Sequence, residues 1–430
     1  ANEALLKQLE IPGLATKRKQ PTTTTTDTRK KKPTVKKVTQ PTRTSSRLRG
    51  KSPDREHREP SPPPKPKMIE SLEEPEQSEL LAVFKQTLQH NIKPEVSSKS
   101  AVEQLGDLKI QHSWRTVKVT PSRIYSCLFH PSNVKLLGCA VDIEGYLGFW
   151  DIDQEKEEEP VVYQYKPHTR TITDLKMDPQ DDSKILTSSY DGYIKVFDMN
   201  HASFETLDLG STYPISSLDI QQDGHLVWFS TMDGDIGYAD RRRGGKPTLY
   251  SPKDKKIGCI HINPIHHELI VAGSNDRTAT LWDIRNLKKN NPLWSQEHGY
   301  SVTSCYWSPK GNKLATTSYD DHIRLFDLDG HKQLHLKSSI THNNHTGRWV
   351  TNFRARWNTN RHHALKYQHL VIGNMKQTLD IFGEDGRELI KLYDEDHITA
   401  IPSVSQCHPN TLEPTILTGN TSGRMVCWRT

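Results

Sequence analysis

A recurring alternation of apolar and polar residues begins at about residue 109. Short apolar segments that start with a β-branched residue return at intervals of 48, 43, 42, 45, 48 and 48 residues. About 27 to 33 residues after each start comes a second element such as "GFWDI", "TLWDI" or "RLFDL", often preceded by an Asp/Gly turn. Such turns are typical of tight hairpins between strands. The segments start at Ile124, Ile172, Ile215, Ile257, Val302, Val350 and Ile398.

Seven repeats of this length with Trp-Asp-like ends predict an all-β fold, a seven-bladed WD40 β-propeller over residues 108–430. Radial closure protects the sheet edges of repeats that cannot bury their faces alone. The last repeat ends at Trp428 without an outer strand. Residues 112–119, which read as a strand, are therefore expected to close the ring.

Residues 1–107 differ sharply from the rest. They are poor in large apolar residues, which predicts a mostly disordered basic tail. Two amphipathic stretches, at about 1–11 and 68–92, predict short helices. In the second, Leu80, Leu81, Phe84 and Leu88 share one face. This helix would pack either on the propeller or on a partner.

The net charge of +6 conceals an asymmetry. Residues 11–67 hold 17 Lys/Arg and 4 Asp/Glu, so the remainder of the chain is acidic. The run Lys30, Lys31, Lys32, Lys36 and Lys37 suits nuclear import or phosphate contact, and hence a nuclear protein. The alternative is that these lysines only keep the tail soluble.

Several classes of function find no support in the sequence. The six cysteines are scattered and form no metal-binding spacing, which favours core thiols over a zinc site. We find no catalytic residues, phosphate loop, cofactor site or small-molecule substrate site. The hairpin aspartates and the histidines that precede inner strands are expected to be structural. No run of about 18 apolar residues predicts a membrane span.

The loops that lead into the inner strands should meet on the narrower face of a propeller, around its central channel. Basic and aromatic residues alternate in these loops, and in "HNNHTGRW" above all, which suits phosphate contact and base stacking. Peptides bind the same face of propellers, and Trp349 could instead plug the channel. The candidate DNA-binding residues are Arg123, Arg170, Lys255, Lys256, Tyr300, His345, Arg348 and Trp349.

The sequence resembles the family of fungal changed-mutation-rate DNA damage-binding proteins and their animal counterparts, the WD repeat-containing protein 76 group. The resemblance rests on "NEALLKQLEI", "RTSSRLRG", "VKVTPSRIYSCLFHP", "TMDGDIGYADRR", "ATLWDIRNL", "HNNHTGRWVTNF" and "ILTGNTSGRM". It implies a nuclear, non-catalytic protein that prefers UV-damaged DNA, acts in genome maintenance and contacts chromatin. The chain is more distantly similar to the small subunit of the UV-damaged-DNA-binding complex, whose inserting tripeptide is replaced here by Gly347-Arg348-Trp349.

A rival hypothesis is an interaction scaffold, either a substrate receptor of a cullin-4 ubiquitin ligase or a histone-binding propeller with incidental DNA affinity. The stretch Trp282, Asp283, Ile284 and Arg285 is similar to the Trp-Asp-x-Arg box of such receptors, and Arg242 belongs to a partial second copy. These arginines would reach the ligase adaptor from the wider face. Equally, the stretch could be an ordinary blade end with a surface arginine.

Overall fold

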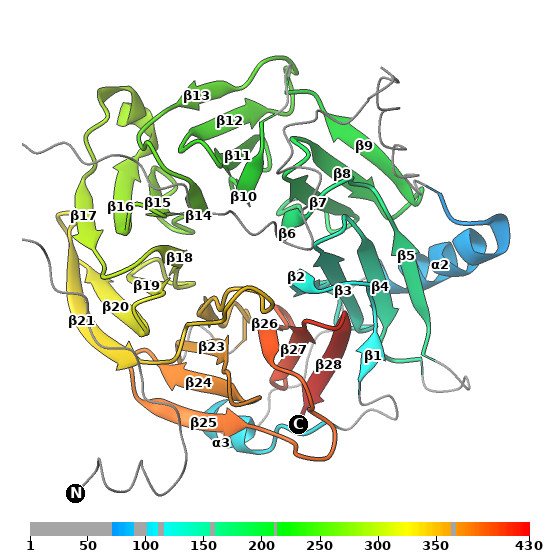
Figure 1. Ribbon diagram of the computed structural model, residues 1–430. Helices are drawn as coiled ribbons and strands as arrows, with labels where there is room; N and C mark the ends of the chain where they lie inside the picture. The colour runs from blue at the N-terminus through cyan, green and yellow to red at the C-terminus, as the bar shows by residue number, and fades with distance from the viewer. Residues whose placement is uncertain (1–70, 90–100, 111–115, 155–159, 210–212, 363–366) are drawn as a thin grey trace, which may run out of the picture. The chain divides into compact units, whose positions relative to one another are not determined.

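The computed structural model describes residues 71–89, 101–110, 116–154, 160–209, 213–362 and 367–430. Seven four-stranded antiparallel sheets stand radially around a central channel (Figure 1), which confirms the predicted seven-bladed propeller. Blades 1 to 6 each use four consecutive strands, from β2–β5 to β22–β25. In blade 7 the order is β1-β28-β27-β26, so β1 is its outer strand.

The strand bounds follow the repeat. Blades 1 to 3 contain β2 (Ile124–Phe129), β3 (Leu137–Asp142), β4 (Leu147–Asp151), β5 (Val162–Tyr165), β6 (Ile172–Met177), β7 (Lys184–Ser189), β8 (Ile194–Asp198), β9 (Ser203–Leu207), β10 (Ile215–Ile220), β11 (Leu226–Thr231), β12 (Ile236–Asp240) and β13 (Thr248–Tyr250). Blades 4 and 5 contain β14 (Ile257–Ile262), β15 (Leu269–Ser274), β16 (Thr278–Asp283), β17 (Trp294–Glu297), β18 (Val302–Trp307), β19 (Lys313–Ser318), β20 (His322–Leu328) and β21 (Leu334–Thr341). Blades 6 and 7 contain β22 (Arg356–Trp357), β23 (His369–Gly373), β24 (Leu379–Gly383), β25 (Glu388–Leu392), β26 (Pro402–Cys407), β27 (Thr415–Asn420), β28 (Arg424–Arg429) and β1 (Val117–Lys118).

Two inner strands start later than the alignment of the internal repeats predicts. The sixth was expected from Val350, but only Arg356–Trp357 joins the β-ladder, and the Thr351 hydroxyl donates instead to the Ile124 carbonyl of blade 1. The seventh was expected from Ile398, but β26 begins at Pro402. Ile398 instead donates its backbone N–H to the Asp394 carbonyl in a turn. Measured at strand ends, Trp357 and Cys407 each follow their predecessor by 50 residues.

The ring is closed between distant parts of the chain. In β1, Val117 pairs with Met425 and Lys118 with Arg424 of β28. An isolated bridge between Lys109 and Arg429 extends this pairing. Residues 112–115 of the predicted closing segment 112–119 lie outside the described residues.

Among the residues that the structure describes, two α-helices pack against the propeller. Helix α2 (Glu74–Thr87) has Pro75 in its first turn, where a missing N–H costs nothing. The helix lies beside β5 (Figure 1), and its Leu80 and Phe84 are buried among the apolar residues of blades 1 and 2. The Phe84 ring meets Phe149 edge to face at 5.2 Å and Phe197 at 5.8 Å. Helix α3 (Ala101–Gly106) brings Leu105 into the cluster of blades 6 and 7, and the 3-10 helix η2 (Ile284–Lys289) follows β16.

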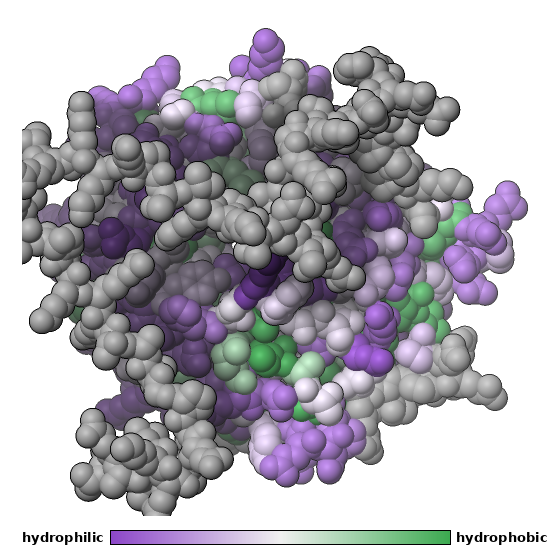
Figure 2. Space-filling model, viewed as in Figure 1, coloured by the Kyte–Doolittle hydropathy of each residue, from purple (hydrophilic) through white to green (hydrophobic). Residues whose placement is uncertain are grey.

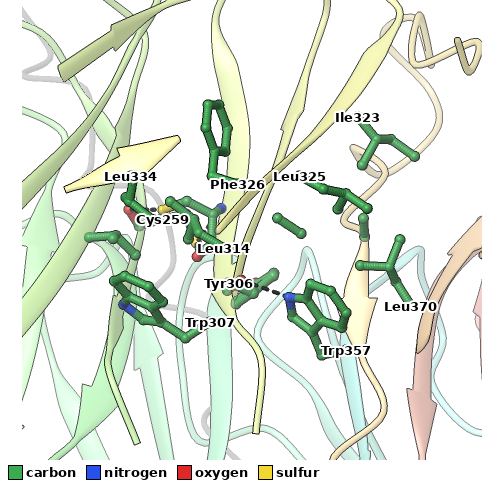
Figure 3. Packing of buried hydrophobic residues seen from close by; sticks show 14 of the residues in the cluster. Cys259, Tyr306, Trp307, Leu314, Ile323, Leu325, Phe326, Leu334, Trp357 and Leu370 are labelled. Atoms are coloured by element: carbon green, nitrogen blue, oxygen red, sulfur yellow. Dashed lines mark hydrogen bonds between the residues drawn. The ribbon is translucent and has the colours of Figure 1, made fainter. Parts of the chain in front are cut away.

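Each pair of neighbouring blades shares a layer of apolar side chains. Between blades 4, 5 and 6 this layer includes Tyr306, Trp307 and Trp357 (Figure 3). The indole N–H of Trp357 donates to the Tyr306 carbonyl at 2.9 Å. On the face shown in Figure 2, hydrophilic side chains predominate among the described residues. Within the described residues, no helix is both long and apolar enough to traverse a bilayer.

Candidate nucleic-acid interface

Two kinds of loop share one rim of the ring, here called the narrow face. They are the loops that lead into the inner strands and the hairpin turns between the second and third strands of each blade. Backbone hydrogen bonds join them, for example from Tyr190 to Thr171 and from Tyr319 to Ser301. The opposite rim, here called the wide face, carries the remaining hairpins. The sequence therefore places its candidate DNA-binding loops on one side.

Residues 342–351 form the most elaborate loop of the narrow face, here called the bracing loop. It begins on blade 5, where the buried Asn344 donates its side-chain amide to the Ser318 carbonyl at 2.9 Å. Gly347 adopts a φ of 65°, which a residue without a Cβ tolerates. The loop then reaches blade 1, where the buried Thr351 hydroxyl donates to the Ile124 carbonyl at 2.6 Å. The loop therefore spans from blade 5 to blade 1.

Arg123 fixes the outer part of this loop. Its guanidinium donates to the Arg348 carbonyl at 2.9 Å. The Trp349 side chain beside this carbonyl is 78% exposed. The indole therefore faces solvent and does not plug the channel, contrary to the alternative that the sequence left open. The Arg348 guanidinium lies 5.6 Å from the centre of the Trp349 ring, so a cation and a flat ring are presented together.

A second group of exposed rings lies beside the bracing loop. The Tyr300 side chain is 60% exposed and meets the His345 ring edge to face at 6.1 Å. His345 also lies 5.7 Å from the ring of Tyr319, and its Nδ1 is 3.6 Å from an Asp321 oxygen. The structure thus brings Tyr300 and His345 together, as the prediction of a shared surface requires.

The other predicted basic residues divide into two kinds. Arg170 and Lys255 are exposed on the narrow face. Lys256 points inward instead, donating to the Tyr190 hydroxyl at 2.6 Å. The Arg123 side chain is likewise hydrogen-bonded to the Arg348 carbonyl. Arg123 and Lys256 therefore hold neighbouring parts of the narrow face in position. The exposed acidic residues Glu395 and Asp396 lie in the loop between blades 6 and 7, where they interrupt the series of basic residues on the narrow face.

The wall of the channel carries charged residues that the sequence analysis did not single out. The Arg354 guanidinium lies 4.9 Å from the centre of the Tyr125 ring. Although burial alone would raise it, the nearby cations Arg354 and Lys256 lower the pKa of Tyr125. Further down, Lys176 pairs with Asp219 at 3.1 Å. The alternating "FRAR" before Trp357 is the signal that could have revealed the arginines.

The two candidate adaptor-contact arginines lie on the wide face and share one geometry. Arg285 is 65% exposed and donates from Nε and Nη2 to the two Asp283 oxygens, at 2.8 and 2.6 Å. Arg242 is 57% exposed and grips Asp240 in the same way, at 3.1 and 3.0 Å. Trp282 is buried, and its indole N–H donates to the Thr280 hydroxyl at 2.8 Å. Blades 3 and 4 therefore present two similarly held arginines.

Other polar residues of the repeats hold the blades together. His168 is buried between Asp191, 2.9 Å from its Nδ1, and Thr187, 2.9 Å from its Nε2. Burial lowers the pKa of His168, which keeps the ring neutral. All six cysteines are buried and unpaired. Within the described part of the chain, no group of three or more His, Cys, Asp or Glu could hold a metal ion. The predicted import residues Lys30 to Lys37 lie outside the described residues.

The chain is similar to known proteins over about three quarters of its length. Residues 159–198 and 290–327 match the family described as WD domain, G-beta repeat. The chain is 32% identical over 361 residues to a DNA damage-binding protein cmr1 of Neurospora crassa, which covers 76% of this chain and 68% of the relative. It is 33% identical over 368 residues to a protein of the same name from Aspergillus oryzae, covering 77% and 69%. A third such relative, from Emericella nidulans, is 32% identical over 371 residues, covering 77% and 70%.

Proposed function

We propose that this chain, which belongs to the family of the DNA damage-binding protein cmr1, binds duplex DNA through its narrow face and prefers damaged DNA. The observation that carries the proposal is the bracing loop, which holds Trp349 and Arg348 in solvent above the channel. Its role is binding, without catalysis, and its cellular location is the nucleus. The cmr1 relatives support DNA as the partner, because they are named DNA damage-binding proteins.

The chemistry of this surface suits a duplex. Exposed Arg170, Lys255 and Arg348 would meet phosphates, since arginine and lysine contacts to the backbone position a protein on DNA. The rings of Tyr300 and Trp349 would stack on bases that leave the helix. The acidic Glu395 and Asp396 would repel phosphates. We therefore expect the duplex to lie over blades 2 to 5 and the bracing loop, away from the junction of blades 6 and 7.

A preference for damage follows from the cost of unstacking. An apolar ring that wedges between base pairs must break their stacking, which costs a few kcal/mol and least where the duplex is already weakened. Because the hydrogen bonds of Arg123 and Thr351 hold the loop to blade 1, Trp349 would be positioned before DNA arrives. Preorganisation of this kind reduces the entropy lost on binding.

The test is fluorescence anisotropy of the full chain with matched undamaged and UV-irradiated duplexes across a salt series. We expect Trp349→Ala to lower affinity for the irradiated duplex about fivefold or more, since stacking on one ring is worth about 1–3 kcal/mol. The ratio of the affinity for irradiated duplex to the affinity for undamaged duplex should fall as well. Arg348→Glu should weaken binding to both duplexes and reduce the salt dependence.

Two matched controls distinguish an effect of the bracing loop from the loss of any exposed aromatic ring or any exposed arginine. Tyr393→Ala removes another exposed aromatic ring on the narrow face, but one beside Glu395 and Asp396, so affinity should not change. Arg387→Glu reverses the charge of an arginine whose side chain is 86% exposed on the wide face. If Trp349→Ala and Tyr393→Ala behave alike, the bracing loop has no special role. DNA affinity would then belong to the basic tail.

A second function is favoured by the paired arginines of the wide face. We propose Trp282, Asp283, Arg285 and Arg242 as the contact for a cullin-4 ligase adaptor, with histones or other chromatin proteins as the cargo. The support is that Arg285 and Arg242 are both exposed and both held by an aspartate two residues earlier. Arg285→Ala should abolish co-purification with the purified adaptor and leave DNA affinity unchanged. Unchanged adaptor binding would contradict this second function.

A further inference from the structure

A cavity of about 260 Å³ opens at the wide-face end of the central channel. Its walls come from the last residues of inner strands and from the hairpins that follow them, including Phe129, Tyr306 and Trp357. In Figure 3, Trp307 and Trp357 lie on either side of Tyr306, at one end of the apolar layer that forms part of this wall. The cavity lies at the opposite rim from the bracing loop, so the proposed DNA surface does not account for it.

The polar groups that line the cavity are mainly hydrogen-bond donors. Arg356, Arg361 and Lys176 contribute three cations. Arg356 donates to the Gln406 side-chain oxygen at 3.2 Å and lies 5.1 Å from the centre of the Tyr306 ring. Among the described residues, no carboxylate lies within ion-pair distance of Arg356 or Arg361. Two guanidinium groups at this cavity therefore have no carboxylate partner within the described part of the chain.

His261 adds a neutral donor to the same wall. Burial lowers its pKa to about 4, so the ring is uncharged at neutral pH. Its Nδ1 accepts the backbone N–H of Trp307 at 3.0 Å. In a neutral imidazole the other nitrogen then carries the proton. Nε2 is therefore a donor.

The acidic residues that line the cavity do not cancel these donors. Asp178 forms an ion pair with Arg241 outside the cavity and accepts the backbone N–H of Gln180. Lys176 is paired with Asp219, which does not line the cavity and also accepts the backbone N–H of Ile262 at 2.7 Å. Asp182 is the remaining carboxylate among the described lining residues, and it is exposed. After these pairings, no carboxylate of the described residues is paired with Arg356 or Arg361, and His261 adds its Nε2 donor beside them.

We infer that the wide-face mouth of the channel is a binding site for the phosphate group of a small molecule. Guanidinium groups bind oxyanions through paired, charge-assisted hydrogen bonds, and a phosphate group offers three acceptor oxygens to several donors at once. The cavity is smaller than the roughly 300–1,000 Å³ of drug-sized ligand sites, so it would hold a phosphate with a compact substituent. A duplex cannot enter a space of this size.

The test is isothermal titration of inorganic pyrophosphate into the full chain at constant ionic strength and pH 7.5. We expect one saturable site. Arg356→Gln and Arg361→Gln should each weaken it about tenfold or more, because each removes a charge-assisted hydrogen bond. Arg387→Gln, on an exposed arginine of the same blade and face that does not line the cavity, should leave it unchanged.

Two further arms keep the result interpretable. Arg361 is exposed, so Arg361→Gln preserves the fold even if Arg356→Gln, which loses the Gln406 contact, does not. Absence of saturable heat, or an equal effect of all three substitutions, would overturn the site and assign pyrophosphate binding to scattered basic residues. The affinity of Arg361→Gln for irradiated duplex should equal that of the unmodified chain. Competition between duplex and pyrophosphate, with both weakened by Arg361→Gln, would mean that the cavity binds DNA phosphates instead.

Discussion

The substitution Thr351→Val tests whether the order of the bracing loop matters for DNA binding. The side chain is 2% exposed, so it cannot touch DNA, and valine keeps its shape and charge. The change removes the 2.6 Å hydrogen bond to the Ile124 carbonyl and leaves that buried acceptor unpaired. Such a loss costs about 1–3 kcal/mol. Any effect on DNA must therefore act through the position of Trp349.

The expected magnitude follows from that cost. If the bond holds the loop closed, its loss shifts the loop toward open forms by the same free energy. Affinity for irradiated duplex would fall by up to about 5- to 140-fold, since 1.4 kcal/mol corresponds to a factor of about ten. Hydrogen exchange of the amides in residues 343–352 should become faster, while the exchange of blades 2 and 3 stays the same.

A matched control exists in blade 2. Thr173 also donates its buried hydroxyl to the first inner-strand residue of a neighbouring blade, the Ile215 carbonyl, at 3.0 Å. Thr173→Val should therefore cost similar global stability without changing DNA affinity. If Thr351→Val speeds exchange in the bracing loop but leaves affinity intact, preorganisation of Trp349 contributes nothing. If both substitutions lower affinity equally, the effect comes from general destabilisation.

Two further predictions concern the stability of the fold. Phe84→Ala should lower the free energy of unfolding by up to about 3–5 kcal/mol, because it leaves a cavity in the core. The loss is smaller if α2 detaches from the propeller before the propeller unfolds. Thermal unfolding measures the change, with the substitution of the exposed Lys85 by alanine as the control. Burial lowers the pKa values of His261 and His298 to about 4, so the unfolded chain takes up protons below pH 6.5 that the folded chain does not. Stability should be fully present above pH 6.5 and fall as the pH drops toward 4, by about 1.4 kcal/mol per pH unit for each such histidine. A melting temperature that is constant over this range would contradict the neutral state of these rings.

The number of blades could be predicted from the sequence because each blade repeats the same local pattern. A β-branched start, an Asp/Gly turn and a Trp-Asp-like end each have a local physical cause, and five of the seven inner strands begin where the pattern predicts. The prediction failed where the chain departs from regular strand. Residues 350–355 alternate like a strand, yet Thr351 bonds to the Ile124 carbonyl of blade 1, and Phe353 and Ala355 bond to threonine side chains of blade 5.

The candidate site was accessible to sequence reasoning only in part. The exposure of Trp349 and the pairing of Tyr300 with His345 agree with a surface built from loops that precede inner strands. The inward roles of Arg123 and Lys256 could not be foreseen. The contact of Arg123 joins residues 225 positions apart, and it exists only after the ring has closed. Arg354 and Arg356 lie within the segment predicted as the sixth strand and were not singled out, although their alternation in "FRAR" places them on one face of a strand.

The two proposed sites should act independently, because the propeller separates them. An inner strand of six residues spans about 20 Å, which places the two rims more than two screening lengths of about 8 Å apart at physiological salt. The charge of Arg361 is therefore screened from phosphates held by Arg348. Substitutions at Trp349 and Arg361 share no contact among the described residues, so their effects on binding should not couple. A rigid ring with loops on both rims can thus hold DNA on one face while a small ligand or an adaptor occupies the other.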